Sequence, residues 1–223
     1  MAKLIEINDL YYAVDGNAVF EGINAEFYEG ERVAIIGPLG YGKTTLLRLI
    51  LGFDKPQRGR VSLFDKDIWM IEQIELYRLR QRTGVIFENA ALISNLKVIE
   101  NIILPLQYHT DLTDDGIMGK AVSLLNHVGY KGDIWALPGP LPFYTKKTIA
   151  LARAMALDPE IMIYDRLLEG LDRLQSLQLL RFAEEFQRQG KGRLSIMIAN
   201  DEQDLKDMTL DRVLRIENRR LVQ

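Results

Sequence analysis

Short apolar runs alternate with longer amphipathic segments along this chain. Leu4 to Leu10 alternates apolar and polar residues, the period of a β-strand, and the turn Asp15-Gly16-Asn17 leads into a second strand over Val19 to Tyr28. Further runs predict strands at 32–36, 60–63, 84–87, 161–164, 195–199 and 212–216, and helices over 71–82, 145–156, 174–186 and 201–208. Strands that alternate with helices in this way predict an α/β fold with a mainly parallel sheet.

The turn after the strand at 32–36 has the clearest chemical pattern. Its residues are Gly37-Pro38-Leu39-Gly40-Tyr41-Gly42-Lys43-Thr44-Thr45, and an apolar-periodic segment follows them. Gly37, Gly42, Lys43 and Thr44 fit G-x-x-x-x-G-K-[ST], the phosphate-binding loop. Glycines allow backbone N–H groups to wrap a polyphosphate, and the start of the next helix adds free donors. We therefore expect residues 37–45 to bind a nucleotide, with Lys43 on the β- and γ-phosphates and the Thr44 hydroxyl on Mg²⁺.

The middle of the chain is mostly helical. Val98, Ile102 and Ile103 share one face of a helix that we expect Pro105 to stop. Thr113 is the expected N-cap of a further helix over 117–128, with Leu124 and Leu125 facing inward. We expect residues 1–223 to form a single domain, in which about 90–158 are an inserted helical subdomain and 1–89 with 159–223 form the nucleotide-binding core.

Composition narrows the range of partners. The chain has 223 residues, no cysteine and a formal net charge of −3. This balance gives no electrostatic case for nucleic-acid binding, and the lack of cysteine excludes disulfides and thiolate metal sites, which is compatible with a reducing cytosol. The charged N-terminus does not resemble a signal peptide, and no apolar run approaches the ~18 residues that span a bilayer. We expect His109 and His127 at the surface or facing a partner, because neither belongs to a set of three or four metal ligands.

The order of motifs resembles that of the ATPase subunit of an ABC transporter over essentially the whole chain. Residues 37–45 match the family form G-x-x-G-x-G-K-[ST]-T, and Asp165 matches the Walker B aspartate. The segment from Leu92 to Leu106, with Tyr108-His109-Thr110, resembles ATPases of bacterial Mce-type lipid-transport systems. The resemblance implies a P-loop NTPase fold with an N-terminal antiparallel β portion. It also implies that ATP and Mg²⁺ bind, with the metal held by Thr44, Asp165 and Glu88.

Several positions of the family's nucleotide site hold other residues in this chain. The catalytic glutamate falls on Arg166, the switch histidine on Asn200 and the Q-loop glutamine on Glu88. The signature Leu-Ser-Gly-Gly-Gln falls on Leu141-Pro142-Phe143-Tyr144-Thr145, whereas the D-loop aspartate is kept as Asp172. The adenine-stacking aromatic falls on Val14; Tyr12, on the same face of the strand, could stack on adenine or belong to the core.

These departures predict weak or absent hydrolysis. Arg166 cannot accept a proton as a general base, and it is left to pair with Asp165, to contact phosphate or to be solvated at the strand end. Pro142 has neither a hydroxyl nor an N–H to offer a γ-phosphate, and Asn200 cannot become cationic. Because a general base contributes ~10²–10⁴-fold in rate, we expect turnover near or below detection and assign no catalytic residue.

The resemblance also implies an assembly. ABC ATPases work as head-to-tail dimers, so the partners would be a membrane permease and either a second copy of this chain or a paralogous ATPase. The protein would then be cytoplasmic and peripheral on the inner face of the cell membrane. Three functions stay open: an ATP-binding transporter subunit with weak or absent hydrolysis, for instance in lipid transport; a regulatory or scaffold pseudo-ATPase; and an active ATPase that uses substitute residues.

Overall fold

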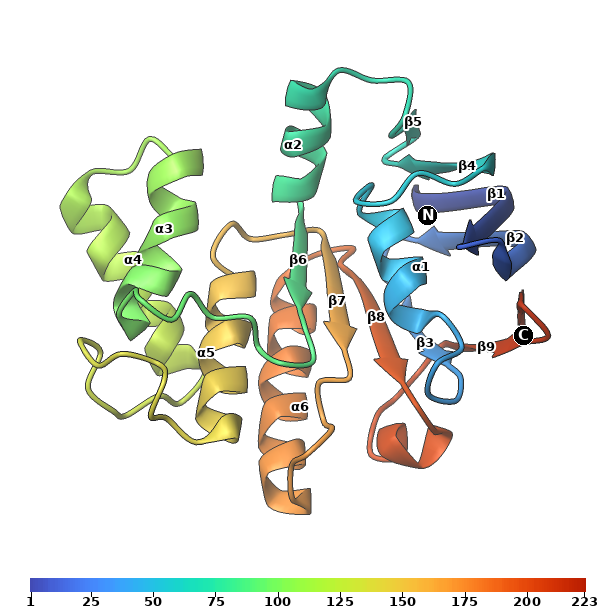
Figure 1. The fold of residues 1–223 in the computed structure, drawn as a ribbon. Helices are drawn as coiled ribbons and strands as arrows, with labels where there is room; N and C mark the ends of the chain where they lie inside the picture. The colour runs from blue at the N-terminus through green and yellow to red at the C-terminus, as the bar shows by residue number, and fades with distance from the viewer.

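Two β-sheets organise residues 1–223 in the computed structural model of this protein (Figure 1). The first is antiparallel and has the order β2-β1-β4-β5. The second has the order β10-β9-β3-β8-β7-β6 and is parallel except for the pair β9 and β10. The strands are β1 (Lys3–Val14), β2 (Asn17–Tyr28), β3 (Arg32–Ile36), β4 (Arg58–Leu63), β5 (Lys66–Asp67), β6 (Thr83–Ile86), β7 (Ile161–Asp165), β8 (Leu194–Ala199), β9 (Arg212–Glu217) and β10 (Arg220–Val222).

Six α-helices and one 3₁₀ helix surround the sheets. They are α1 (Lys43–Ile50), α2 (Gln73–Gln81), α3 (Val98–His109), α4 (Asp114–His127), α5 (Phe143–Ala154), α6 (Arg173–Gln189) and the 3₁₀ helix η1 (Glu202–Leu205). The helix expected over 201–208 is thus only the short η1, and α5 begins two residues earlier than expected. None of the helices combines the length and the hydropathy of a membrane-spanning segment.

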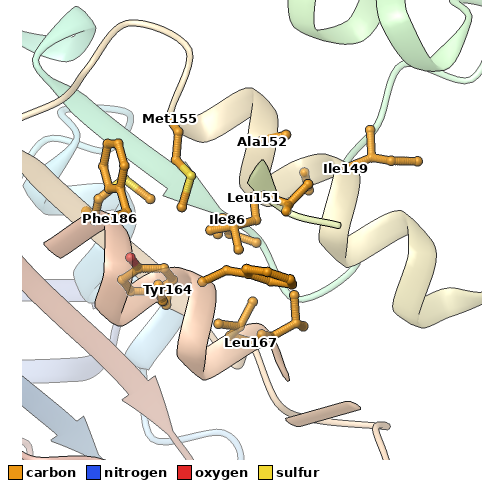
Figure 2. Packing of buried hydrophobic residues seen from close by; sticks show 14 of the residues in the cluster. Ile86, Ile149, Leu151, Ala152, Met155, Tyr164, Leu167 and Phe186 are labelled. Atoms are coloured by element: carbon orange, nitrogen blue, oxygen red, sulfur yellow. The ribbon is translucent and has the colours of Figure 1, made fainter. Parts of the chain in front are cut away.

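The parallel sheet separates two hydrophobic clusters, because alternate residues of its strands face opposite sides. On β7, Met162 and Tyr164 face the first cluster, with α3 to α6, whereas Ile161 and Ile163 face the second, with α1, α2 and the antiparallel sheet. Figure 2 shows Tyr164 and other buried side chains of the first cluster gathered around α5 and α6.

Pro105 does not stop α3, so that prediction was wrong. Proline removes one N–H from the helical ladder, but α3 continues to His109. The last turn is held by Thr110, whose N–H and hydroxyl both donate to the carbonyl of Leu106, at 3.1 and 2.7 Å. Leu106 is also fully buried in the first cluster. Packing of this turn therefore outweighs the lost hydrogen bond.

The two histidines have different environments. His109 is exposed, as expected, with its Nδ1 3.0 Å from the Gln81 side chain. The surface position expected for His127 holds only in part: this side chain is half-buried, with its ring 6.4 Å from that of Phe182 on α6. The Nε2 of His127 is buried and has no hydrogen-bond partner. The N-cap expected at Thr113 is confirmed by a bond from the Gly116 N–H to its hydroxyl.

Candidate functional site

Four neighbouring strands of the parallel sheet end at one edge and bring the predicted residues together. In the order β3, β8, β7 and β6, the strands lead into Gly37, Asn200, Arg166 and, one residue further on, Glu88. The carboxyl edge of a parallel sheet is where α/β proteins bind ligands, since loops from several strands meet there. Residues separated by more than 160 positions in the sequence thus share one site.

The phosphate loop has the geometry that its sequence predicts. Lys43 is the first residue of α1 and is buried, and its Nζ donates to the carbonyls of Gly37 and Pro38. Gly42 has φ +89°, and a Cβ there would lie 2.7 Å from Cγ1 of Val19. Only glycine fits this position. Burial lowers the pKa of Lys43, and the charge of Arg166 lowers it further.

A cavity of about 230 Å³ lies over this loop. Arg166, which directly follows β7, also lines it, so a second cation joins Lys43 at the same cavity. Tyr12 does not line it; this tyrosine is half-buried and packs on the second cluster. The full lining is Val19, Leu39, Gly40, Gly42, Lys43, Thr44, Thr45 and Arg166. Tyr41, half-exposed, lines a neighbouring cavity of about 340 Å³.

Arg166 forms the centre of a charged cluster. Its guanidinium forms a salt bridge with the Glu88 carboxylate, and its Nε lies 3.6 Å from Asp165 and 3.7 Å from Glu169. Only 13% of its side chain is exposed. The pKa of Asp165 is raised by burial, with Glu88 adding to the effect and Arg166 opposing it. Of the readings left open for Arg166, pairing with carboxylates is therefore the observed one.

Lys147 was not predicted as part of this site. It is fully buried on α5, and its Nζ donates to the carbonyls of Arg166, Leu167 and Glu169 at 2.8, 2.7 and 2.9 Å. Burial lowers the pKa of Lys147 to about 8, and the nearby charge of Glu169 opposes this shift. No local pattern in the sequence marks Lys147, because it lies in the polar stretch Thr145-Lys146-Lys147-Thr148 at the start of α5. The three bonds fix the backbone from which Arg166 projects.

The residues expected to hold Mg²⁺ do not fit it in this arrangement. The Thr44 hydroxyl does lie 3.5 Å from Asp165, which is the pair the sequence predicts. The third group, Glu88, is bound by the guanidinium of Arg166, which also lies against Asp165. No group of three or more carboxylates or histidines is placed to hold a metal ion. The position between these carboxylates is already taken by a cation.

Comparisons with known proteins agree with this geometry. A family model described as ABC transporter matches residues 20–167. The chain belongs to the ABC transporter family. It is 30% identical to the intermembrane phospholipid transport system ATP-binding protein MlaF of Haemophilus influenzae, over 91% of this chain and 76% of that protein. It is 29% identical to the probable ribonucleotide transport ATP-binding protein mkl of Mycobacterium leprae, over 90% of this chain and 58% of that protein.

Solved structures of ABC proteins share the fold. The ATP-binding cassette MJ0796, in a dimeric state bound to ADP and Pi, superposes with a TM-score of 0.88 at 22% identity and covers 99% of this chain and 97% of its own. CbiO1 from Clostridium perfringens, part of the ABC transporter complex cbiONQ, gives 0.86 at 25% identity, over 100% and 88%. The family and the fold class predicted from the motifs are confirmed.

The segment at the ABC signature position starts a helix in this chain. Pro142 is the N-cap residue of α5, and Phe143 is its first residue and is 41% exposed. The Tyr144 hydroxyl donates to Gln178 of α6 at 2.9 Å. No residue of 141–145 lines the cavity over the phosphate loop. This surface therefore presents a proline and two aromatic rings instead of the small donors of the family.

Two further ABC positions have structural partners. The Asn200 amide donates to Glu169 at 3.3 Å, which ties β8 to the charged cluster. Asp172 is the N-cap of α6 and accepts from the Gln175 N–H at 2.9 Å. Both side chains thus stabilise the edge of the site in the absence of a ligand.

Proposed function

We propose that this chain is the ATP-binding subunit of an ABC transport complex and that it hydrolyses ATP weakly or not at all. The observation that carries the proposal is Arg166, whose guanidinium lines the cavity over the phosphate loop where the family has a glutamate. A guanidinium has donors and no acceptor, so it holds phosphate but cannot take a proton from water. The phosphate loop, with Lys43 and Thr44, supports ATP as the ligand.

The proposed transport role is based on sequence similarity to named transport proteins. MlaF proteins are named for intermembrane phospholipid transport, and similarity to them over 91% of this chain supports a lipid as the transported molecule. The expected partners are a membrane permease and a second ATPase, either a copy of this chain or a paralogue. Such a complex would hold the protein on the inner face of the cell membrane. The metal set of Thr44, Asp165 and Glu88 stays a prediction, which the pairing of Glu88 with Arg166 does not favour.

ATP binding and ATP turnover measured on one purified sample test the proposal. We expect wild type to bind ATP and Lys43→Ala to bind at least ~tenfold more weakly, because a charge-assisted contact to phosphate is lost. Lys191→Ala, exposed in the loop before β8, is the matched control and should bind as wild type does. Equal affinity of the wild type and Lys43→Ala would contradict ATP binding on this loop. Sustained phosphate release that Lys43→Ala abolishes would instead support an active ATPase.

A scaffold function without nucleotide is the second candidate. It is favoured by the charged cluster around Arg166, because the Glu88 carboxylate is already paired with the Arg166 guanidinium and needs no metal ion or nucleotide as a partner. The discriminating measurement is co-purification with the permease, followed by comparison of the complex with and without ATP. A stable complex whose geometry does not respond to ATP supports the scaffold and contradicts the first proposal.

A further inference from the structure

We propose that the Arg166 guanidinium takes the place of the divalent cation, so that this chain needs no divalent ion to bind a nucleoside triphosphate. The inference rests on the proposed function of the loop at 37–45 as a nucleotide site. It removes one requirement of that site: the triphosphate binds equally well with and without a divalent ion.

The backbone fixes the direction in which Arg166 points. Its φ is +48°, in the left-handed region that is strained for a non-glycine residue and persists only where the surroundings impose it. Two hydrogen bonds impose it here. The Arg166 N–H donates to the Ile198 carbonyl at 3.0 Å, and the Arg166 carbonyl accepts from the Lys147 Nζ at 2.8 Å. The side chain therefore projects from a clamped strand end rather than from a mobile loop.

The charges of the site balance without a metal. Glu88, Asp165 and Glu169 supply three negative charges around Arg166, which with Lys43 and Lys147 gives three positive charges. A divalent ion between Asp165 and Glu88 would add two charges beside a guanidinium that remains charged in proteins. The side chains of Asp165 and Arg166 are largely buried, so solvent would screen little of the repulsion between such an ion and the guanidinium.

Asp165 and Arg166 each have one buried polar atom without a hydrogen-bond partner. These atoms are Oδ1 of Asp165 and Nε of Arg166, and they are 3.6 Å apart, so a small movement of the guanidinium pairs them. The other carboxylate oxygen of Asp165 lies 3.5 Å from the Thr44 hydroxyl. Both oxygens of Asp165 thus have a complementary group of this chain close by.

The same guanidinium can meet the ligand. Arg166 lines the cavity of about 230 Å³ together with Lys43, Thr44 and the glycines of the phosphate loop. A triphosphate in that cavity would lie between an ammonium and a guanidinium, and arginine binds phosphate oxygens through parallel N–H donors. The guanidinium then supplies hydrogen-bond donors to the phosphate oxygens at a place where Mg²⁺ would otherwise contact them.

The test is the affinity for ATP in excess Mg²⁺ and in excess EDTA, by calorimetry on the full chain. Wild type should give the same dissociation constant in both solutions within ~threefold. Arg166→Gln keeps a polar side chain with N–H donors, although a shorter one, and removes the charge, and its affinity for ATP should fall at least ~tenfold in EDTA with recovery on adding Mg²⁺. Arg173→Gln, an exposed arginine at the start of α6, is the matched control and should behave as wild type.

Each outcome decides the question. ATP binding by wild type that tightens by ~tenfold or more with Mg²⁺ overturns this inference and leaves the proposed function intact. Equal behaviour of Arg166→Gln and wild type in EDTA also overturns it. No binding by wild type in either solution overturns the proposed function and this inference together. The comparison of the two solutions needs only wild type, so it stands even if Arg166→Gln does not fold.

Discussion

Lys147 is a charge placed deep in the first hydrophobic cluster with three backbone carbonyls as its partners. None of its hydrogen bonds goes to a carboxylate, although Glu169 and Glu88 are near enough to oppose the effect of burial on its pKa. Methionine at this position would fill similar space and leave the three carbonyls without their donor. Unpartnered buried carbonyls cost free energy.

We predict that Lys147→Met lowers the free energy of unfolding at pH 7 by about 1–3 kcal/mol, and that the gap from wild type widens at alkaline pH. The pKa of Lys147 is about 8 in the folded protein against a usual 10.5. Between these values the unfolded chain holds more protons, so the wild type gains stability as the pH rises, by roughly 1–2 kcal/mol. Below pH 8 both states are protonated and the contribution is constant.

Urea denaturation at pH 7 and at pH 9.5 measures the free energy of unfolding of the wild type and of Lys147→Met. Lys191→Met, which changes an exposed lysine, should show no gap from wild type that depends on pH. A gap between wild type and Lys147→Met that stays constant over this range would contradict a lowered pKa for Lys147.

The buried side-chain amide of Asn101 connects α3 to the segment that follows β6. Asn101 is fully buried; its Nδ2 donates to the carbonyls of Ile93, Leu96 and Lys97, and its Oδ1 accepts from the Ile93 N–H at 2.8 Å. These bonds hold residues 93–97, which join the end of β6 to α3. These bonds thus tie the segment that follows β6 to α3.

We predict that Asn101→Ala destabilises the protein by about 2–4 kcal/mol, since it breaks a buried hydrogen-bond network. Hydrogen exchange should rise at residues 93–97 and stay low in α6, because the loss is local to the connection. Asn126→Ala, exposed on α4, is the control. Unchanged protection of 93–97 in Asn101→Ala would show that other contacts hold this segment.

The elements that the sequence predicted best are those whose pattern is local. Continuous apolar runs predicted the buried strands that face both clusters, alternation predicted β1, and the contiguous motif at 37–45 predicted the phosphate loop. The edge strands β5 and β10 have two and three residues, too few to show a period. The end of α3 was misplaced because the packing of Leu106 outweighs the local effect of Pro105.

The site was predictable only in part, for a related reason. Asp165, Arg166 and Glu88 could be located by their places after apolar runs. That Glu88 and Glu169 both turn to Arg166, and that Lys147 holds the segment beneath it, depends on the order of strands and on how α5 packs. Such distances between remote residues do not follow from spacing along the chain.

The protein as a unit consists of two hydrophobic clusters that share strands β3, β7 and β8. Neither cluster is closed without the sheet between them. Because both clusters pack on the same strands, unfolding of one cluster disrupts the strands on which the other cluster packs. The division into a nucleotide-binding core and a helical subdomain at about 90–158 stays a prediction.

We predict one cooperative unfolding transition, seen equally from both sides of the sheet. Trp69 packs on the second cluster, and Trp135 follows Ile134, which packs on the first. Fluorescence of the single-tryptophan variants Trp135→Phe and Trp69→Phe should give the same urea midpoint. Ile163→Ala, in the second cluster, should lower the free energy of unfolding by about 2–5 kcal/mol with both reporters. A shift seen by Trp69 alone would mean that the clusters unfold separately.

Arg166 differs from a metal ion in one further respect: it cannot diffuse away. A cation fixed to the chain has a constant effective concentration at its site, whereas an ion must be recruited from solution at the cost of its translational freedom. With the guanidinium as the counter-charge, occupancy of the cavity over the phosphate loop follows the supply of nucleotide alone. The complex would then respond to the energy state of the cell and be indifferent to its supply of divalent ions.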